Sequence, residues 1–350
     1  MIRAKGTSRL TICLLALATI PWVGACSHQT LDPLAGGGSG AAWPKYPAKS
    51  HVRYLGVLTG EDDFGHDASK AFWTELVHGP TPPVKMVTPM GVCVSRDGSK
   101  VAVADVNDHS IHVFDLVAKK YRRVDRWSES GRLESPVAVT WVGDDLWIAD
   151  SKLGAVAIIN GAMTKEAVGG RVIGEGKLKR PASLAYCAAN QLCYVVDSAA
   201  HKVVAFDRSG NVAREFGSPG AGPGQLNYPS HIAVGANDTL AVADSLNFRV
   251  QQFSLDGSPK GMFGRKGDAA GDLALPKGVA YDASGNIWVA DAHFENVQAF
   301  TTQGELLMAF GEEGTGVGEF WLPAGVFIDQ MQRLWVTDSY NRRVQVFQLL

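Results

Sequence analysis

Residues 276–291 have the sequence PKGVAYDASGNIWVAD, and the chain contains six copies of this stretch. Each copy begins at a proline and ends at an aspartate that closes an apolar run. Consecutive aspartates are separated by 45 residues once and by 47 residues thereafter. A repeat of this period indicates one supersecondary unit copied in series. The aspartates are Asp105, Asp150, Asp197, Asp244, Asp291 and Asp338, and the prolines are Pro89, Pro136, Pro181, Pro229, Pro276 and Pro323.

Each repeat predicts four short strands joined by tight turns. In the fifth repeat we expect strands at Gly278–Tyr281, Asn286–Ala290, Asn296–Phe300 and Glu305–Phe310. The second of these strands is apolar on both faces, which is typical of a strand covered on both sides. In a ring of small sheets, each sheet is covered by its neighbours. The sequence therefore predicts an all-β fold, a six-bladed β-propeller with four antiparallel strands per blade.

The two ends of the chain indicate how the ring closes. The sixth repeat stops after its third strand, at Arg343–Leu349, without a fourth. Near the N-terminus, Val52–Val57 resembles the fourth strands of other repeats, such as Leu307–Gly311. We expect this strand to complete the last blade, so that residues 51–350 form one closed propeller.

The first 25 residues have the features of a lipoprotein signal peptide. Three basic side chains precede an apolar stretch, Leu10–Ile20, that is too short to span a bilayer. The sequence Val23-Gly24-Ala25-Cys26 resembles the bacterial lipobox, so we expect Cys26 to carry lipid. Residues 26–50, with their glycine run and prolines, are expected to form a flexible tether.

The anchor predicts a location in the cell envelope. Ser27 follows the lipidated cysteine, where an aspartate would resemble an inner-membrane retention signal, so the outer membrane is favoured. In an oxidising compartment Cys187 and Cys193, which flank a short predicted turn, are candidates for a disulfide, with two buried thiols as the alternative. Cys93, inside an apolar run, is expected to be a buried small hydrophobe.

Composition and charge limit the classes of function. The formal net charge is −2, and it becomes more negative when the basic signal segment is removed. The chain therefore has no general basic surface for nucleic acid, and the local cluster at residues 119–123 is better explained as a solvated outer strand. There is no Cys-x-x-Cys-His motif for covalent haem, and no spacing that marks a catalytic triad.

Several segments resemble the NHL repeat: Pro276–Ala280 with Trp288–Asp291, the segment Asp338–Phe347, and the joining segment Phe310–Pro323. The resemblance covers residues 51–350 and is weakest in the second repeat, where an Asn-x-Arg element is missing. The chain also resembles a group of bacterial six-bladed NHL lipoproteins often encoded near multihaem c-type cytochromes. This resemblance implies a monomeric propeller that is accessory to an extracytoplasmic electron-transfer system.

Features that recur in the repeats are expected to be structural. Each aspartate is expected to cap the N–H groups of the turn after its own strand. The glycine clusters Gly217–Gly224 and Gly311–Gly318 are expected in inter-blade turns, without a phosphate-binding role. Three tryptophans that share one register, Trp147, Trp288 and Trp335, are expected to pack between blades.

Features that differ between repeats are expected to carry the function. In NHL propellers one face is built from the turn after each aspartate and from the segment joining consecutive blades. The sharpest anomaly is His231, at a position that is Gly, Ala or Ser in the other repeats, and we expect it to project into the channel or its mouth. The candidate binding face consists of His109, His201, His231, Phe248, His293, Phe294 and Tyr340.

The segment 59–88 is an insertion between the closing strand and the first innermost strand. Asp67 is suited to cap a short helix, and the apolar residues between Phe72 and Val77 keep i, i+4 spacing. A lid or docking element and a packed insertion without a further role are both open.

Two functions are consistent with these features. The first is a membrane-anchored, non-catalytic binding or scaffold module, without a cofactor, whose face contacts a protein partner or a small ligand. The second is a metal-dependent lyase, because Asp197–His201 resembles a ligand-bearing turn of the peptidyl-hydroxyglycine amidating lyases, zinc enzymes with six-bladed NHL propellers. Its metal, zinc or calcium, would be held by His201 and His231, which come from adjacent repeats. The streptogramin lyases are a more distant comparison.

Overall fold

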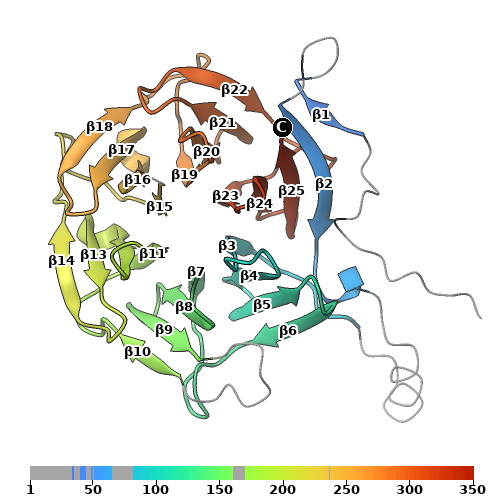
Figure 1. Ribbon diagram of the computed structural model, residues 1–350, viewed down its shortest axis with the longest axis vertical. Helices are drawn as coiled ribbons and strands as arrows, with labels where there is room; N and C mark the ends of the chain where they lie inside the picture. The colour runs from blue at the N-terminus through green and yellow to red at the C-terminus, as the bar shows by residue number, and fades with distance from the viewer. Residues whose placement is uncertain are drawn as a thin grey trace, which may run out of the picture. The chain divides into compact units, whose positions relative to one another are not determined.

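Six antiparallel sheets form a closed ring in the computed structural model (Figure 1). The structure describes residues 34, 40–44, 49, 51–64, 82–160, 170–235 and 237–350. Each repeat forms one blade, and the innermost strands of consecutive blades contact one another all the way round, with β23 against β3. The predicted six-bladed propeller is confirmed. The innermost strands are β3 (Pro89–Val94), β7 (Pro136–Val142), β11 (Pro181–Cys187), β15 (His231–Val234), β19 (Pro276–Tyr281) and β23 (Pro323–Ile328).

The second strand of each blade ends at the aspartate of its repeat, and it is buried because a blade lies on either side of it. Two short 3-10 helices, η2 (Ser198–Ala200) and η3 (Ser245–Asn247), form the turns after the third and fourth of these strands. The second strands are β4 (Lys100–Asp105), β8 (Asp145–Asp150), β12 (Leu192–Asp197), β16 (Thr239–Asp244), β20 (Ile287–Asp291) and β24 (Arg333–Asp338). The third strands are β5 (Ser110–Asp115), β9 (Ala155–Ile159), β13 (Lys202–Phe206), β17 (Arg249–Ser254), β21 (Asn296–Phe300) and β25 (Arg343–Leu349).

The outermost strand of the last blade comes from the N-terminal part of the chain. Strand β2 (Val52–Leu58) pairs antiparallel with β25, as the sequence predicts, and η1 (Glu61–Phe64) follows it. The outermost strands of the other blades are β6 (Lys120–Val124), β10 (Arg171–Ile173), β14 (Val212–Phe216), β18 (Pro259–Phe263) and β22 (Leu306–Phe310). The ring is therefore closed by hydrogen bonds between distant parts of the chain.

The segment predicted as a tether ends earlier than expected. Strand β1 (Ala42–Trp43) pairs with the start of β2, and the Trp43 ring lies 5.4 Å from the ring of Phe310 and 5.7 Å from that of Phe347. A tether was expected because glycine and proline dominate this region, but one tryptophan supplies enough apolar surface to dock two residues of it.

Other predictions fall outside the described residues. These are the signal peptide at residues 1–25, the lipidated Cys26, the part of the tether before residue 40 apart from Leu34, and the helix that begins at Asp67. In the part of the chain that the structure describes, no helix is long and apolar enough to cross a membrane.

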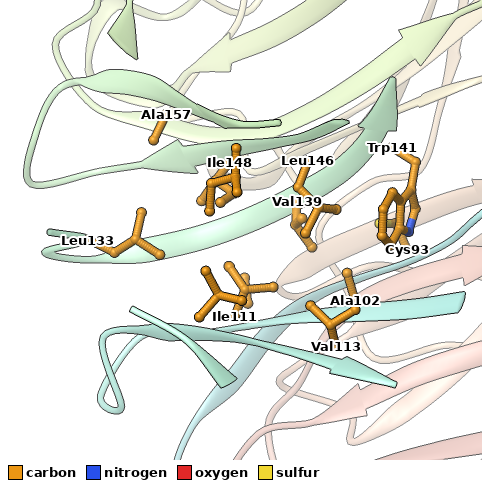
Figure 2. Close-up of a cluster of buried hydrophobic side chains, with 13 residues drawn as sticks. Cys93, Ala102, Ile111, Val113, Leu133, Val139, Trp141, Leu146, Ile148 and Ala157 are labelled. Carbon is orange, nitrogen blue, oxygen red and sulfur yellow. The ribbon is translucent and has the colours of Figure 1, made fainter. Parts of the chain in front are cut away.

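Apolar layers between neighbouring blades form the core. Figure 2 shows the layer between the first two blades, where Ile111 and Val113 of β5 face Val139 of β7 and Ile148 of β8. Trp147, Trp288 and Trp335 each belong to such a layer, which confirms their predicted role between blades. Cys93 lies in the layer of Figure 2 as a buried thiol, also as predicted, and burial raises its pKa.

The predicted disulfide between Cys187 and Cys193 is wrong. Both thiols are free and buried. In the pairing of β11 with β12, Cys187 is opposite Leu192, whereas Cys193 is opposite Tyr186. Paired residues share a face of the sheet and neighbouring residues alternate, so the two sulfurs lie on opposite faces, in different apolar layers. The prediction rested on the short distance in sequence between the two cysteines, which does not determine the register of the two strands.

We predict that Leu58→Ala destabilises the propeller by about 2–5 kcal/mol, the usual cost of truncating a buried leucine. Leu58 is fully buried on the closing strand β2, in one layer with Phe64 and Trp335. Urea unfolding followed by tryptophan fluorescence measures the change. Leu307→Ala, on an outer strand with the side chain 52% exposed, is the matched control and should have a much smaller effect. Equal losses would show that β2 is not part of the cooperative core.

Candidate functional site: a pocket on the propeller axis

A buried aspartate in each blade positions the segments around the axis. Asp291 Oδ1 accepts hydrogen bonds from the N–H groups of His293 and Phe294, in the turn after its strand, at 3.0 and 3.2 Å. Its carboxylate also accepts from the N–H groups of Ala274 and Leu275, just before the innermost strand, at 2.7 and 3.0 Å. The predicted capping role is thus confirmed for Asp291, and likewise for Asp105, Asp150 and Asp197. It is wrong for Asp244 and Asp338, whose carboxylates instead accept hydrogen bonds from side chains of the turn and of the next strand. The bonds to the incoming segment were not predicted, and they tie both segments to one carboxylate.

In the fourth and sixth blades the aspartate is paired with an arginine. Arg249 Nε donates to Asp244 Oδ2 at 2.8 Å, and its Nη atoms donate to the carbonyl oxygens of Ala221, Gly222 and Gln225. The same contacts recur around Arg343 and Asp338. The Asn-x-Arg element therefore holds the glycine-rich loop that leads into its own blade, as expected for inter-blade turns.

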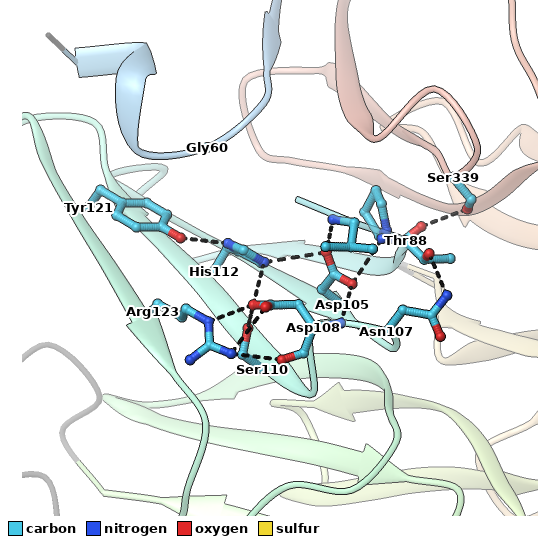
Figure 3. Close-up of polar contacts among 12 residues, drawn as sticks. Gly60, Thr88, Asp105, Asn107, Asp108, Ser110, His112, Tyr121, Arg123 and Ser339 are labelled. Carbon is cyan, nitrogen blue, oxygen red and sulfur yellow. Dashed lines mark hydrogen bonds and ion pairs between the residues drawn. The ribbon is translucent and has the colours of Figure 1, made fainter. Parts of the chain in front are cut away.

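In the first blade, a histidine side chain lies beside the aspartate of the repeat. Figure 3 shows His112, fully buried, with Nε2 3.4 Å from Asp105 Oδ2 and 3.4 Å from Asp108 Oδ2. Its Nδ1 lies 2.7 Å from the Tyr121 hydroxyl oxygen, and Arg123 of the outer strand binds Asp108. Burial raises the pKa of the Tyr121 hydroxyl. His112 thus replaces the glutamine that binds the aspartate in the fourth and sixth blades.

The residues that follow the six prolines meet around the axis. They line a pocket of about 300 Å³ to which every blade contributes. The walls also include the residue after the aspartate in the second, third and fourth blades, Ser151, Ser198 and Ser245. The six residues after the prolines are Met90, Val137, Ala182, Ser230, Lys277 and Ala324.

His231 reaches the pocket in a different way from that predicted. It lies two residues after its proline, where side chains point toward the next blade: Ser183 Oγ accepts from Ile232 N, and a Cβ on Gly278 would meet the backbone of Ala324 at 2.3 Å. His231 Nδ1 likewise accepts from the N–H of Val279, at 3.3 Å. The ring therefore packs between the fourth and fifth blades while also lining the pocket.

The hydrogen bond to His231 fixes its tautomer. Burial lowers the pKa of His231 to about 4, so the ring is neutral at physiological pH. Because Nδ1 accepts a hydrogen bond, the single proton lies on Nε2. His231 thus acts as a neutral N–H donor at the wall of the pocket.

The charged residues of the pocket are both cations. Lys277 and Arg180 belong to its lining, and none of the described lining residues is acidic. Burial and the nearby charge of Arg180 lower the pKa of Lys277. Sequence reasoning missed Lys277, although it is the only charged residue among the six that follow a proline. Comparing that position across the repeats would have identified it.

The other residues of the candidate binding face lie outside this pocket. His109, His201 and Phe248 share a left-handed turn position, with φ of 52°, 55° and 56°. His109 Nδ1 donates to the carbonyl of Glu134, beside a second hollow at the rim. His201 Nδ1 accepts from Tyr228 N and its ring packs 4.6 Å from the Tyr228 ring. These histidines connect neighbouring blades.

The aromatic members of the predicted face are not part of the pocket lining. Phe248 lies beneath the Lys266 ammonium group, and His293 packs against Phe294. Tyr340 is 54% exposed and packs edge-on against Trp321, which is 46% exposed. Trp321 was not predicted. It precedes a proline by two residues, a position at which the repeats were not compared.

Each of the two proposed metal ligands, His201 and His231, already uses one ring nitrogen in a hydrogen bond. The Nδ1 atom of each ring already accepts a backbone hydrogen bond, so each could offer only Nε2 to a metal. Over the described ranges, no group of three or more His, Cys, Asp or Glu side chains is arranged to hold a metal ion.

Known families match parts of the chain. The matching models are the SMP-30/Gluconolactonase/LRE-like region over residues 235–311, a 6-bladed beta-propeller family over residues 182–263, and the NHL repeat over residues 320–347. No curated protein matches the sequence. The predicted resemblance to NHL propellers is thereby confirmed, and the chain is a six-bladed propeller with an NHL repeat in its last blade.

Solved structures share the fold at low identity. Virginiamycin B lyase from Staphylococcus aureus is 15% identical with a TM-score of 0.55, over 75% of this chain and 96% of that chain. An auxiliary nutrient binding protein from Bacteroides thetaiotaomicron is 11% identical with a TM-score of 0.59, over 75% of this chain and 69% of that chain. At such identities the likeness shows the fold alone.

We predict that Arg249→Ala destabilises the protein by about 3–5 kcal/mol, because it leaves the buried Asp244 carboxylate without its cation. Thermal and urea unfolding of the two proteins measure the loss. Lys152→Ala, which removes an ion pair at the exposed surface, is the control and should leave the unfolding midpoint almost unchanged. A small effect of Arg249→Ala would show that the loop carbonyls need no cation.

Proposed function

We propose that this six-bladed NHL propeller is a non-catalytic binding module that takes a small ligand on its axis. The observation that carries the proposal is the pocket to which all six blades contribute side chains that the repeat does not share. Concave sites that are mostly apolar, with a few polar groups, are the usual form of ligand pockets in proteins. The pocket volume lies at the small end of that class.

A protein partner could dock around the same opening. The exposed large side chains Tyr228, Leu246, Trp321 and Tyr340 all lie in the turns and joining segments of one rim. Exposed aromatic residues of this kind are enriched at protein interfaces. Because they sit on two blades only, the fourth and the sixth, we place them second to the pocket.

We further propose that the propeller is lipid-anchored in the cell envelope, in the outer membrane. The lipobox-like Val23–Cys26 and the basic, apolar segment before it support this. The resemblance to lipoproteins encoded near multihaem cytochromes supports a role accessory to extracytoplasmic electron transfer. In that role the ligand pocket would face the periplasm or the exterior, at the end of the tether.

The metal-dependent lyase is the alternative function. Its support is the resemblance of Asp197–His201 to a lyase turn, together with the fold shared with virginiamycin B lyase. Zinc and calcium content of the purified full chain, with and without His231→Ala, tests it. Stoichiometric metal that is lost in the variant would favour the lyase, and unchanged metal content would count against it.

We predict that Val137→Trp abolishes ligand binding without unfolding the protein, because residue 137 faces the pocket and a larger ring fills it. A thermal-shift screen of small organic molecules against the full chain provides the measurement. Compounds that raise the melting temperature of the wild type should have no effect on the variant. Val117→Trp, at a turn residue that is 79% exposed, is the matched control. Ligands that still stabilise Val137→Trp, or that are consumed during incubation, would contradict a binding pocket on the axis.

We predict that Cys26→Ser releases the chain from the membrane fraction, because the lipid has no other attachment site in the lipobox. Cell fractionation with mass spectrometry of the N-terminal peptide measures both location and acyl groups. Cys93→Ser changes a buried thiol of the propeller and serves as the control, which should stay with the membrane. Membrane retention of Cys26→Ser would contradict the anchor.

A further inference from the structure

The lysine in the pocket is not explained by the propeller itself. The corresponding residues of the other five blades are Met90, Val137, Ala182, Ser230 and Ala324, so the scaffold folds without a charge at this position. Lys277 is partly buried, and burial disfavours its charged form. A group that costs stability and that five equivalent positions lack is a candidate for a role in binding.

The neighbouring groups make the region cationic. Arg180 lies close enough for its charge to act on Lys277, and both side chains line the pocket. In the described part of the chain neither cation has a carboxylate partner. By contrast, Arg249, Arg333 and Arg343 on the same propeller each pair with a buried aspartate. The pocket thus holds two positive charges in a protein whose formal net charge is −2.

Neutral donors line the same pocket as the two cations. His231 has its proton on Nε2 because Nδ1 accepts from Val279. Among the described residues the hydroxyls of Tyr228 and Ser198, which also line the pocket, have no hydrogen-bond partner. Ser230 and Ser245 instead donate to backbone carbonyls and are occupied. The free polar groups therefore favour an acceptor-rich, negatively charged ligand.

The remaining walls are apolar. Met90, Val137, Leu246, Leu275 and Ala324 line the pocket together with the cations. A hydrated inorganic anion gains little from such walls and loses solvation there. A hydrocarbon chain or ring gains from them, and its acidic group can reach Lys277 and Arg180.

We infer that the axial pocket binds a small organic carboxylate, with its carboxylate between Lys277 and Arg180 and its apolar body against the opposite walls. This inference rests on the proposed function, since it names the ligand class of the same pocket. The bound carboxylate supplies the counter-ion that the fold does not, so the lysine is fully charged in the complex. Charge-assisted hydrogen bonds to the carboxylate provide most of the preference over a neutral compound.

The test compares three probes on the purified full chain by isothermal titration calorimetry: hexanoate, its neutral counterpart hexanamide, and inorganic phosphate. We expect hexanoate to bind roughly tenfold more tightly than hexanamide, which corresponds to one charge-assisted contact. Lys277→Gln and Arg180→Gln should each weaken hexanoate about tenfold and leave hexanamide unchanged. Lys260→Gln, at an exposed position on the outer strand β18, is the matched control and should alter neither probe.

A second measurement does not depend on the choice of probe. Lys277→Met should raise the melting temperature of the ligand-free chain, because it removes an unpaired, partly buried charge. A lysine that served the fold would give the opposite shift. Both readouts must agree, and a lowered melting temperature would overturn the inference.

The remaining outcomes separate this inference from the proposed function. Equal binding of hexanoate and hexanamide, lost in Val137→Trp, would overturn the carboxylate and leave the pocket as a binding site. Binding of phosphate alone, or of neither organic probe, would overturn the ligand class. Hexanoate binding that survives both Lys277→Gln and Arg180→Gln would place the anion elsewhere.

Discussion

The rest of the structure depends on one buried carboxylate per blade. Each aspartate ends a strand that is covered on both sides and accepts hydrogen bonds from the incoming segment, and in four blades also from the N–H groups of its turn. These donors are part-buried, so without the carboxylate they would lose a hydrogen-bond partner, at a cost of up to about 1–3 kcal/mol each. The same bonds fix where the innermost strand begins. They therefore set the positions of the residues that face the axis.

The copies satisfy this carboxylate in different ways. Arg249 and Arg343 bring a cation and hold a glycine-rich loop, whereas His112 and Arg123 divide the task in the first blade. In the second, third and fifth blades the donors to the aspartate among the described residues are backbone N–H groups. The need to provide partners for the buried carboxylate can thus be met by different side chains in different blades. This tolerance explains why all six repeats form blades of four or five strands although only the fourth and sixth contain the Asn-x-Arg element.

The period of the repeat and its apolar strands were sufficient to predict the fold, including closure by Val52–Leu58. Periodicity carries this information because each blade buries its faces against identical neighbours. The sequence carries less information on the register of the strands and on the direction of the side chains. The disulfide between Cys187 and Cys193 was wrong because a shift of one residue moves a sulfur to the other face of the sheet. The docked Trp43 was missed because a single aromatic residue in a glycine-rich segment has no periodic signal.

The same argument explains why His231 was identified and Lys277 was not. Adjacent residues of a strand project to opposite faces. At the start of an innermost strand one face meets the next blade and the other meets the axis. The position of His231 is small in the other blades because the next blade lies within 3 Å of an added carbon at Gly91, Gly278 and Gly325. That constraint makes a histidine conspicuous in the alignment of repeats. The axial position lines the pocket and is occupied by Met, Val, Ala, Ser or Lys, so its variation looks like the absence of a constraint. In a ring of similar blades, a position that is not needed for packing between blades can vary and can therefore be used to bind a ligand. The residues facing the axis are therefore where repeat propellers of this type can differ in specificity while keeping one fold.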